Sequence, residues 1–277
     1  YGKKLLNGDP TALSSLKEEL ALLRASKKKL LTSAGYPENY LEPVYECPDC
    51  KDTGYIGNEK CHCFKKAIIE LLYEQSNIKK IPEDADFSNF RLDYYSRSHY
   101  DKKTGRSARE AMENTLEICR HFVDSFGTEF HNLFLYGDVG VGKTYLSTCI
   151  AKEIINREFS VIYFSAPQLF NTLAQNTFDK KDVDARNMSE YIFECDLLII
   201  DDLGTEMTTQ FTVSALYQVV NGRLLSGRPT IVSTNLPDSE LEARYSAQIA
   251  SRLLGAYTLY QFCGTDVRLL KKMESRM

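Results

Sequence analysis

The sequence predicts an α/β fold for residues 107–277, with a central parallel sheet flanked by helices. In this region, short apolar runs alternate with stretches of helical periodicity. Strands of a parallel sheet are buried on both faces, so they read as nearly continuous apolar segments. Parallel neighbours also need a crossover connection, which a helix usually supplies. A glycine-rich stretch at 137–144 joins the first of these strands to the next helix.

The elements of this region are expected in a regular order that begins with a helix. We expect helices at 107–125, 143–156, 166–175, 184–194, 210–225, 238–254 and 265–275. Strands are expected between them, at 132–136, 160–164, 196–200, 229–233 and 257–261. Each of these strands is a short run rich in β-branched, leucine or aromatic side chains, which is typical of buried strands.

The N-terminal part is organised differently. A leucine-rich helix is expected at 10–35, where an Asp-Pro pair marks its start and a glycine ends it. A second helix is expected at 64–75, after a segment that is dense in cysteine. We therefore expect three parts: a small helical domain at 1–80, a linker at 81–106 and the α/β domain at 107–277.

Composition limits the class of protein. The chain has 277 residues, of which 43% are hydrophobic and 26% charged, as in ordinary soluble globular proteins. A formal net charge of −4 excludes a uniformly basic protein that coats nucleic acid, so any nucleic-acid site must be a local patch. No apolar run is long enough to span a membrane, and no signal-peptide pattern opens the chain. We expect a cytoplasmic protein with no membrane partner.

The glycine-rich stretch is the strongest motif in the chain. It reads Gly137, Asp138, Val139, Gly140, Val141, Gly142, Lys143 and Thr144. This fits G-x-x-x-x-G-K-[ST], in which backbone N–H groups and a helix N-terminus cradle phosphate oxygens. In such a loop Lys143 reaches the β- and γ-phosphates, and Thr144 holds Mg²⁺. The pattern predicts a nucleoside triphosphate site, whereas a plain flexible turn is the alternative.

Polar side chains end two of the later strands. Asp201 and Asp202 follow an apolar run, and two carboxylates there are costly without a cation. We expect Asp201 to position Mg²⁺ through water and Asp202 to orient or deprotonate the attacking water. Glu206 is an alternative activator, although a surface role is the simpler interpretation. Asn235 follows the next strand and can hold the lytic water, whereas an ordinary turn residue is the alternative.

Four of the eight cysteines lie close together in the sequence. They form one C-x-x-C pair, Cys47 and Cys50, and one C-x-C pair, Cys61 and Cys63. Four thiolates on a short hairpin can close a tetrahedral Zn²⁺ site, which stabilises a small domain that has little apolar core. His62 is an alternative fourth ligand in place of Cys63. Disulfides and an iron–sulfur cluster are alternative interpretations.

The order of these motifs resembles that of AAA+ ATPases, which implies ATP rather than GTP. The series is D-L-L-I-I-D-D-L-G-T-E at 196–206, S-T-N-L at 233–236, S-R-L at 251–253 and G-T-D-V-R at 264–268. The resemblance implies that Asn235 is the sensor-1 residue and that Arg268 is the sensor-2 residue that faces the nucleotide. It also implies that Arg252 is an arginine finger acting on the nucleotide of a neighbouring subunit, with Arg244 as a weaker candidate.

Within that class, the full pattern resembles DnaC/DnaI-type bacterial helicase loaders and the related IstB transposition ATPases. The resemblance implies an ATP-dependent helicase loader, which binds a replicative DnaB-type helicase hexamer and delivers it onto single-stranded DNA. ATP hydrolysis would be weak until self-association through the ATPase domain supplies Arg252. The cysteine segment resembles the zinc module with which some loaders contact the helicase. Alternatives are an accessory transposition ATPase on duplex DNA and a regulatory module that ATP switches without turnover.

Two further expectations come from the same resemblance. Phe87 or Phe90, in the lead-in to the ATPase domain, is expected to stack on adenine, whereas core packing is the alternative. The insert at 166–194 is expected to contact single-stranded DNA, with an ordinary solvated helix as the alternative. The basic and aromatic residues of this insert are Lys180, Lys181, Arg186, Phe170 and Phe178.

Overall fold

The computed structural model describes residues 12–64, 67, 85–98, 100, 105–178 and 183–275. The chain divides into two compact units, Tyr1–Cys61 and His62–Met277. The expected boundary near residue 80 and most of the helix expected at 64–75 lie outside the described residues. The expected division into three parts therefore stays a prediction. Within the described residues, no helix combines the length and apolar character that a membrane span needs.

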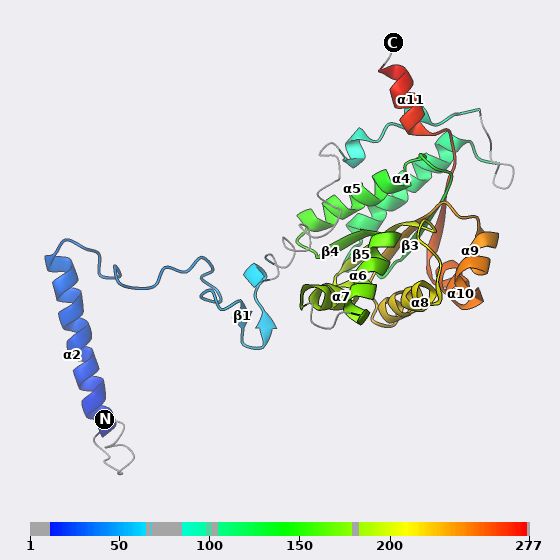
Figure 1. The fold of residues 1–277 in the computed structure, drawn as a ribbon. Helices are drawn as coiled ribbons and strands as arrows, with labels where there is room; N and C mark the ends of the chain where they lie inside the picture. Colours follow the sequence, from blue (N-terminus) through cyan, green and yellow to red (C-terminus); the bar gives the residue numbers. More distant parts are fainter. Residues whose placement is uncertain are drawn as a thin grey trace. The chain divides into compact units, whose positions relative to one another are not determined.

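The N-terminal unit contains one long helix and a small hairpin (Figure 1). Helix α2 spans Ala12–Ser33, within the expected range, and Gly35 with a φ of 82° follows its end. Strands β1 (Tyr55–Ile56) and β2 (Glu59–Lys60) pair antiparallel. Between residues 13 and 61, the buried residues are Cys47, Cys50, Gly54 and Cys61. The described part of this unit therefore has no apolar core apart from its cysteines.

The second unit is built on a parallel sheet of five strands, as the sequence predicts. The strands are β3 (Leu133–Gly137), β4 (Val161–Ser165), β5 (Leu197–Leu203), β6 (Thr230–Thr234) and β7 (Thr258–Phe262). Their order is β4-β5-β6-β3-β7, and every neighbouring pair is parallel. The carboxyl ends of β3, β5 and β6 therefore meet at one edge of the sheet, where ligands of open α/β sheets bind.

Helices cover both faces of this sheet (Figure 1). They are α4 (Ala108–Asp124), α5 (Lys143–Asn156), α6 (Ala166–Phe178), α7 (Val183–Glu194), α8 (Gln210–Leu225), α9 (Asp238–Tyr245) and α10 (Ala247–Ala256). Helix α11 (Val267–Glu274) follows the last strand and projects beyond the sheet (Figure 1). One apolar cluster lies between the sheet and α4 with α5, and the other lies between the sheet and α6 to α10. Alternate residues of β3, β4, β5 and β6 enter opposite clusters, which is why the middle of each of these strands is apolar.

The helix expected at 238–254 is wrong as a single element. It divides into α9 and α10 at Ser246, whose φ of 86° is incompatible with a continuous helix. Tyr245, the last residue of α9, is buried and its hydroxyl bonds the carboxylate of Glu206. This long-range contact lies at the end of α9, where the local pattern predicts that the helix continues.

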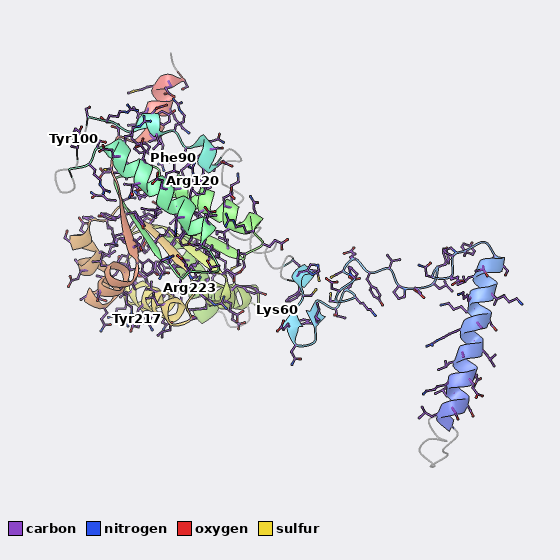
Figure 2. All side chains as sticks on the ribbon, turned by 180° about the vertical axis from the view of Figure 1, so that it is seen from behind. Lys60, Phe90, Tyr100, Arg120, Tyr217 and Arg223 are labelled. Carbon is purple, nitrogen blue, oxygen red and sulfur yellow. The ribbon has the colours of Figure 1, made fainter. Side chains whose placement is uncertain are left out.

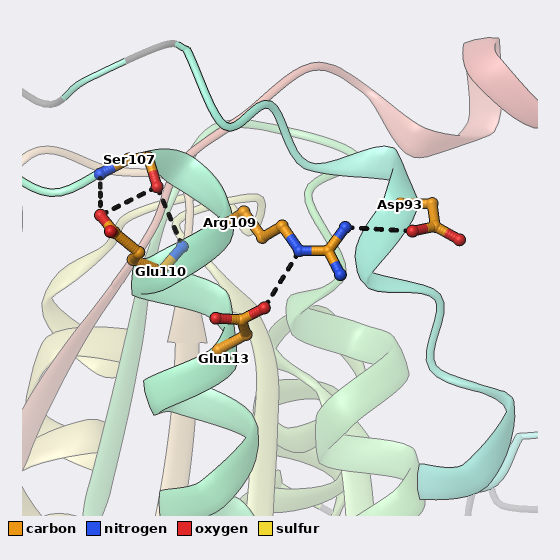
Figure 3. A network of polar contacts seen from close by, with 5 residues as sticks. All are labelled: Asp93, Ser107, Arg109, Glu110 and Glu113. Carbon is orange, nitrogen blue, oxygen red and sulfur yellow. Dashed lines mark hydrogen bonds and ion pairs between the residues drawn. The ribbon is translucent and has the colours of Figure 1, made fainter.

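The lead-in to the α/β sheet of the second unit is attached to α4 by polar contacts (Figure 3). Two short 3-10 turns, η2 (Phe87–Asn89) and η3 (Leu92–Tyr94), precede α4. Ser107 caps α4 and shares a reciprocal capping box with Glu110. Arg109 then bonds Glu113 within α4 and Asp93 in η3. These contacts position the lead-in beside the carboxyl edge of the sheet.

Arg223 of α8 is fully buried, and the sequence pattern does not predict it (Figure 2). Its guanidinium donates to the carbonyl oxygens of Ile192, Cys195 and Pro229 and to the hydroxyl of Thr230. A buried cation is costly unless its N–H groups are bonded. Here the end of α7 and the start of β6 supply those acceptors, so Arg223 joins three elements.

Candidate functional site

The glycine-rich loop lies where β3 passes into α5. Its backbone is packed too closely to admit a side chain at Gly137, because a Cβ atom there would lie 1.9 Å from the carbonyl oxygen of Phe262. Gly142 has a φ of 99°, and a Cβ there would lie 2.8 Å from the hydroxyl of Tyr95. Both positions therefore require glycine. The result is a narrow loop whose backbone leads directly into the N-terminus of α5, as phosphate binding needs.

Lys143 is buried at the start of α5. Its ammonium donates to the carbonyl oxygens of Gly137, at 2.8 Å, and Asp138, at 2.5 Å. Burial lowers the pKa of Lys143, while the nearby charges of Asp202 and Asp201 oppose that shift. The ammonium thus lies over the loop between backbone acceptors and carboxylates, where an anionic ligand would improve its solvation.

The acid pair ends β5 at the same edge of the sheet. Asp201 is buried, and its carboxylate accepts from the hydroxyls of Tyr163 and Ser233. Burial raises the pKa of Asp202 and so does the charge of Asp201, whereas Lys143 opposes the shift. Two adjacent carboxylates at one strand end fit a divalent cation, since Mg²⁺ prefers oxygen ligands and its charge offsets their repulsion.

A cavity of about 390 Å³ opens over the loop and Asp202. Its lining includes many of the residues expected from the sequence: Val139, Gly140, Gly142, Lys143, Thr144, Asp202, Asn235 and Arg268. Asn235 also bonds the side chain of Asp202. The other residues expected at this site, Gly137, Asp138, Val141 and Asp201, are not part of the lining. The structure therefore brings Lys143, Thr144, Asp202, Asn235 and Arg268 to one cavity, while Asp201 lies behind its lining.

The opposite wall of the cavity is aromatic. Phe90 lines it and stacks on Tyr95 with 5.7 Å between ring centroids, and Tyr145 lies 5.9 Å from Phe90. Phe87 instead packs in the core beneath α4, with 9% of its surface exposed. Of the two residues expected to stack on adenine, only Phe90 faces the cavity. Tyr145 was not expected, although its place directly after the loop was a usable signal.

The G-T-D-V-R segment closes another side of the cavity. The N–H of Val267 donates to the carbonyl oxygen of Gly140 at 3.0 Å, so α11 begins on the loop itself. Asp266 caps α11 by accepting from the N–H of Arg268 at 2.9 Å. At the other end of α11, Glu274 pairs with Arg91 and bonds Tyr94 in the lead-in. Arg268 consequently lies in the cavity near Asp202 and Lys143.

The expected arginine finger does not line this cavity. Arg252 of α10 donates to the Asn221 side chain at 2.9 Å and to the Tyr217 hydroxyl at 3.0 Å. Its guanidinium also lies 4.7 Å from the centre of the Tyr217 ring, a cation–π contact. Arg244, the weaker candidate, bonds the Thr208 hydroxyl. Arg252 is thus held on α8 of its own subunit, and a role in a neighbour's site stays a prediction.

Glu206 is not a surface acid. It is buried, accepts from the N–H of Gly204 at 2.9 Å and bonds the Tyr245 hydroxyl. Its backbone carbonyl also accepts from Arg244 at 2.7 Å. Because these contacts join the loop after β5 to α9, Glu206 has a structural position and does not reach the cavity lining.

The expected DNA-contacting insert is described only in part. Lys180 and Lys181 lie outside the described residues, and the side chains of Phe178 and Arg186 are not described. Phe170 is buried in the cluster beneath α6, so it is not available for the DNA contact expected of this insert. Its apolar ring follows the helical spacing of the core face.

The four cysteines of the N-terminal segment come together. The sulfur atoms of Cys47, Cys50, Cys61 and Cys63 all lie within 4.8 Å of one another. Cys47 and Cys61 are 3.7 Å apart, which matches the roughly 3.8 Å edge of a tetrahedron with Zn–S bonds of about 2.3 Å. The N–H of Gly54 donates to the Cys50 sulfur at 3.3 Å, as around metal-bound thiolates. This donor set fits Zn²⁺, and no disulfide joins the described cysteines.

Comparison with known proteins agrees with this geometry. Residues 76–259, more than half of the chain, match the model of the family described as IstB-like ATP binding protein. The replicative helicase loader DnaC of Escherichia coli (strain K12) is 22% identical over 204 residues, covering 73% of this chain and 77% of that protein. The phage-like element PBSX protein XkdC of Bacillus subtilis (strain 168) is 25% identical over 271 residues, covering 93% of each chain.

A solved structure shows the same fold. The crystal structure of a DNA replication initiation factor superposes with a TM-score of 0.55 at 21% identity. The match covers 71% of this chain but spans only 55% of that one, so it supports the fold and not a shared activity. The family resemblance that the sequence motifs indicate is confirmed by the matching family model and the similar helicase loader. The chain belongs to the family of IstB-like ATP binding proteins, and it is an AAA+ ATPase.

Proposed function

We propose that the cavity binds ATP with Mg²⁺ and that its residues act as the motif series implies. Lys143 neutralises the β- and γ-phosphates, and Thr144 and Asp201 hold Mg²⁺, the latter through water. Mg²⁺ supplies charge stabilisation on the transferred phosphoryl group. Asp202 accepts the proton of the attacking water, and Asn235 orients that water.

Two arginines complete this proposal. Arg268 contacts the phosphates from α11 within the same subunit. Arg252 reaches the nucleotide of a neighbouring copy after self-association through the ATPase domain, where its charge stabilises the transition state. Since Arg252 is held on Tyr217 and Asn221 within one subunit, turnover by the isolated chain is slow.

We further propose that this ATPase is a helicase loader. In this role the N-terminal unit binds a replicative helicase hexamer of the DnaB type, and the ATPase unit delivers that helicase onto single-stranded DNA. The observation that carries the proposal is a cysteine cluster with the geometry of a metal site, in a chain whose ATPase part is similar to a replicative helicase loader. Helix α2 supports a docking role, because leucines such as Leu22, Leu23 and Leu30 are exposed.

The test is co-elution of the full chain, assayed for metal, with a DnaB-type helicase in the presence and absence of ATP–Mg²⁺. We expect a complex with the wild type and none with Cys47→Ser/Cys50→Ser. Cys263→Ser is the matched control, because this cysteine lies outside the cluster. Asp202→Asn is expected to retain the complex and ATP binding but to lose turnover about 100-fold.

The outcomes separate this proposal from its alternatives. Wild-type protein that does not bind the helicase but assembles with ATP on duplex DNA would indicate an accessory transposition ATPase. The matching family model favours this as the second candidate. Turnover that Asp202→Asn leaves unchanged would contradict the assigned role of Asp202. Negligible wild-type turnover, with an ATP-dependent complex that Asp202→Asn leaves unchanged, would instead indicate a switch that ATP binding alone operates.

A further inference from the structure

The carboxylate of Asp201 is held from both sides by hydroxyl groups. Asp201 ends the apolar part of β5, which lies between β4 and β6. Tyr163 of β4 donates to Oδ2 at 2.8 Å, and Ser233 of β6 donates to Oδ1. All three side chains are buried. Each oxygen of this acid thus has a fixed donor from a different neighbouring strand.

Ser233 also controls the backbone of the second acid. Its Oγ accepts from the N–H of Asp202 at 2.9 Å while it donates to Asp201. Asp202 has a φ of 55°, a left-handed conformation that residues other than glycine rarely adopt. The register of β5 against β6 shifts between Ile200 and Leu203, around the two acids. A side chain therefore supplies the acceptor for this N–H where the pairing is irregular.

A third hydroxyl extends this arrangement to the phosphate loop helix. Thr148 makes a side-chain hydrogen bond to Tyr163 and lines the cavity. It lies four residues after Thr144 on α5, hence on the same face of that helix. The bonded series runs from Thr148 through Tyr163, Asp201 and Ser233 to the backbone of Asp202. It connects the helix that carries one proposed Mg²⁺ ligand to the strand end that carries the other.

We propose that Ser233 and Tyr163 are positioning residues for the Mg²⁺–nucleotide site, an inference that rests on the proposed roles of Asp201 and Asp202. A carboxylate offers about four lone pairs, and the two hydroxyls occupy two of them. The remaining lone pairs are left for a metal-bound water, in a carboxylate that can no longer rotate. Ser233 additionally stabilises the left-handed backbone that brings Asp202 to the cavity, while Asp201 stays behind it.

The test compares full-length variants in which one hydroxyl is removed. The variants are Ser233→Ala and Tyr163→Phe, with Ser233→Thr as the conservative variant that keeps the hydroxyl. Ser147→Ala is the matched control, because Ser147 is equally buried but its hydroxyl has no hydrogen-bond partner among the residues that the structure describes. Tyr257→Phe is the control for Tyr163, since this buried tyrosine precedes β7 at the opposite edge of the sheet.

Equilibrium binding of a fluorescent ATP analogue is measured with EDTA and across a Mg²⁺ titration, together with ATP turnover and thermal unfolding. We expect binding in EDTA to stay unchanged. The gain in affinity on adding Mg²⁺ and the turnover number should each fall about tenfold or more in Ser233→Ala and Tyr163→Phe, as expected for a lost bond to a charged group. Ser233→Thr should recover to within about threefold of wild type.

Equal Mg²⁺ dependence in Ser233→Ala and Ser147→Ala, or no rescue by Ser233→Thr, would overturn the inference. If Ser233→Ala fails to fold, Tyr163→Phe decides alone, because it removes a single oxygen. Lys143→Ala separates failure of the inference from failure of the proposed site. Nucleotide binding that survives in Lys143→Ala contradicts the site, whereas its loss, alongside wild-type behaviour of Tyr163→Phe, contradicts only the positioning role.

Discussion

The two units of this chain are stabilised by different means. The ATPase unit buries apolar side chains on both faces of a five-stranded sheet. In the N-terminal unit, residues 13–61 bury three cysteines and one glycine and leave the leucines of α2 largely exposed. A unit without an apolar core needs another source of stability, and metal coordination is the one that its donor set supports. The comparison teaches that only the ATPase unit should fold by hydrophobic burial alone.

The largest expected effect comes from removing the metal. Chelation, or Cys47→Ser/Cys50→Ser, should abolish the structure of the segment around β1 and β2, because structural Zn²⁺ contributes about 10–16 kcal/mol in small zinc domains. Hydrogen exchange of residues 47–61 measures this loss. The thermal transition of the ATPase unit should stay unchanged, and a large shift there would contradict independent stabilisation of the two units.

A matched pair of leucine substitutions sharpens the same contrast. Leu216 of α8 is fully buried, whereas Leu22 of α2 is 70% exposed. Leu216→Ala should lower the free energy of unfolding by about 3 kcal/mol, since it leaves a cavity in a packed core. Leu22→Ala should change it by less than about 0.5 kcal/mol. Denaturant unfolding of both variants checks this, and a costly Leu22→Ala would reveal a core that α2 shares in the isolated chain.

The smallest expected effect is a pH dependence within the ATPase unit. Hydrogen bonds from Ser107 hold the pKa of Glu110 below its ordinary value. An acid with a lowered pKa stabilises the folded state above its unfolded pKa, and that contribution is lost as pH falls through the folded pKa. Glu110→Gln should therefore lower the melting temperature slightly at neutral pH, with a difference that shrinks in acid. If the melting-temperature difference between Glu110→Gln and wild type grew in acid, the lowered pKa of Glu110 in the folded state would be contradicted.

Sequence patterns predicted the ATPase fold well, because its signals are local. Continuous apolar runs identify strands of a parallel sheet wherever those strands finally lie. The glycines of the phosphate loop are required by the backbone itself, as the close approach of Phe262 to Gly137 shows. The single helix expected at 238–254 is interrupted at Ser246, next to a contact of Tyr245 with Glu206 that joins residues far apart in sequence.

Within the site, too, local motifs were predicted and contacts between distant residues were not. Five residues that the motif order assigns to one site do line the same cavity: Lys143, Thr144, Asp202, Asn235 and Arg268. The motif order could not choose between Phe87 and Phe90, because both are aromatic and only packing beneath α4 decides which one faces the ligand. Nor could it show that Arg252 is held on Tyr217, since that contact depends on how α10 packs against α8.

By itself, then, the sequence determined the order of strands and helices, the phosphate loop, the acid pair and the cysteine quartet, because each depends on spacing between near neighbours. Only the tertiary structure decided that Tyr163 and Ser233 hold Asp201, that Arg223 joins three elements and that Glu206 is buried. These contacts depend on the strand order β4-β5-β6 and on helix packing. Hydrogen bonds between distant residues follow from which elements become neighbours, and no local pattern contains that information.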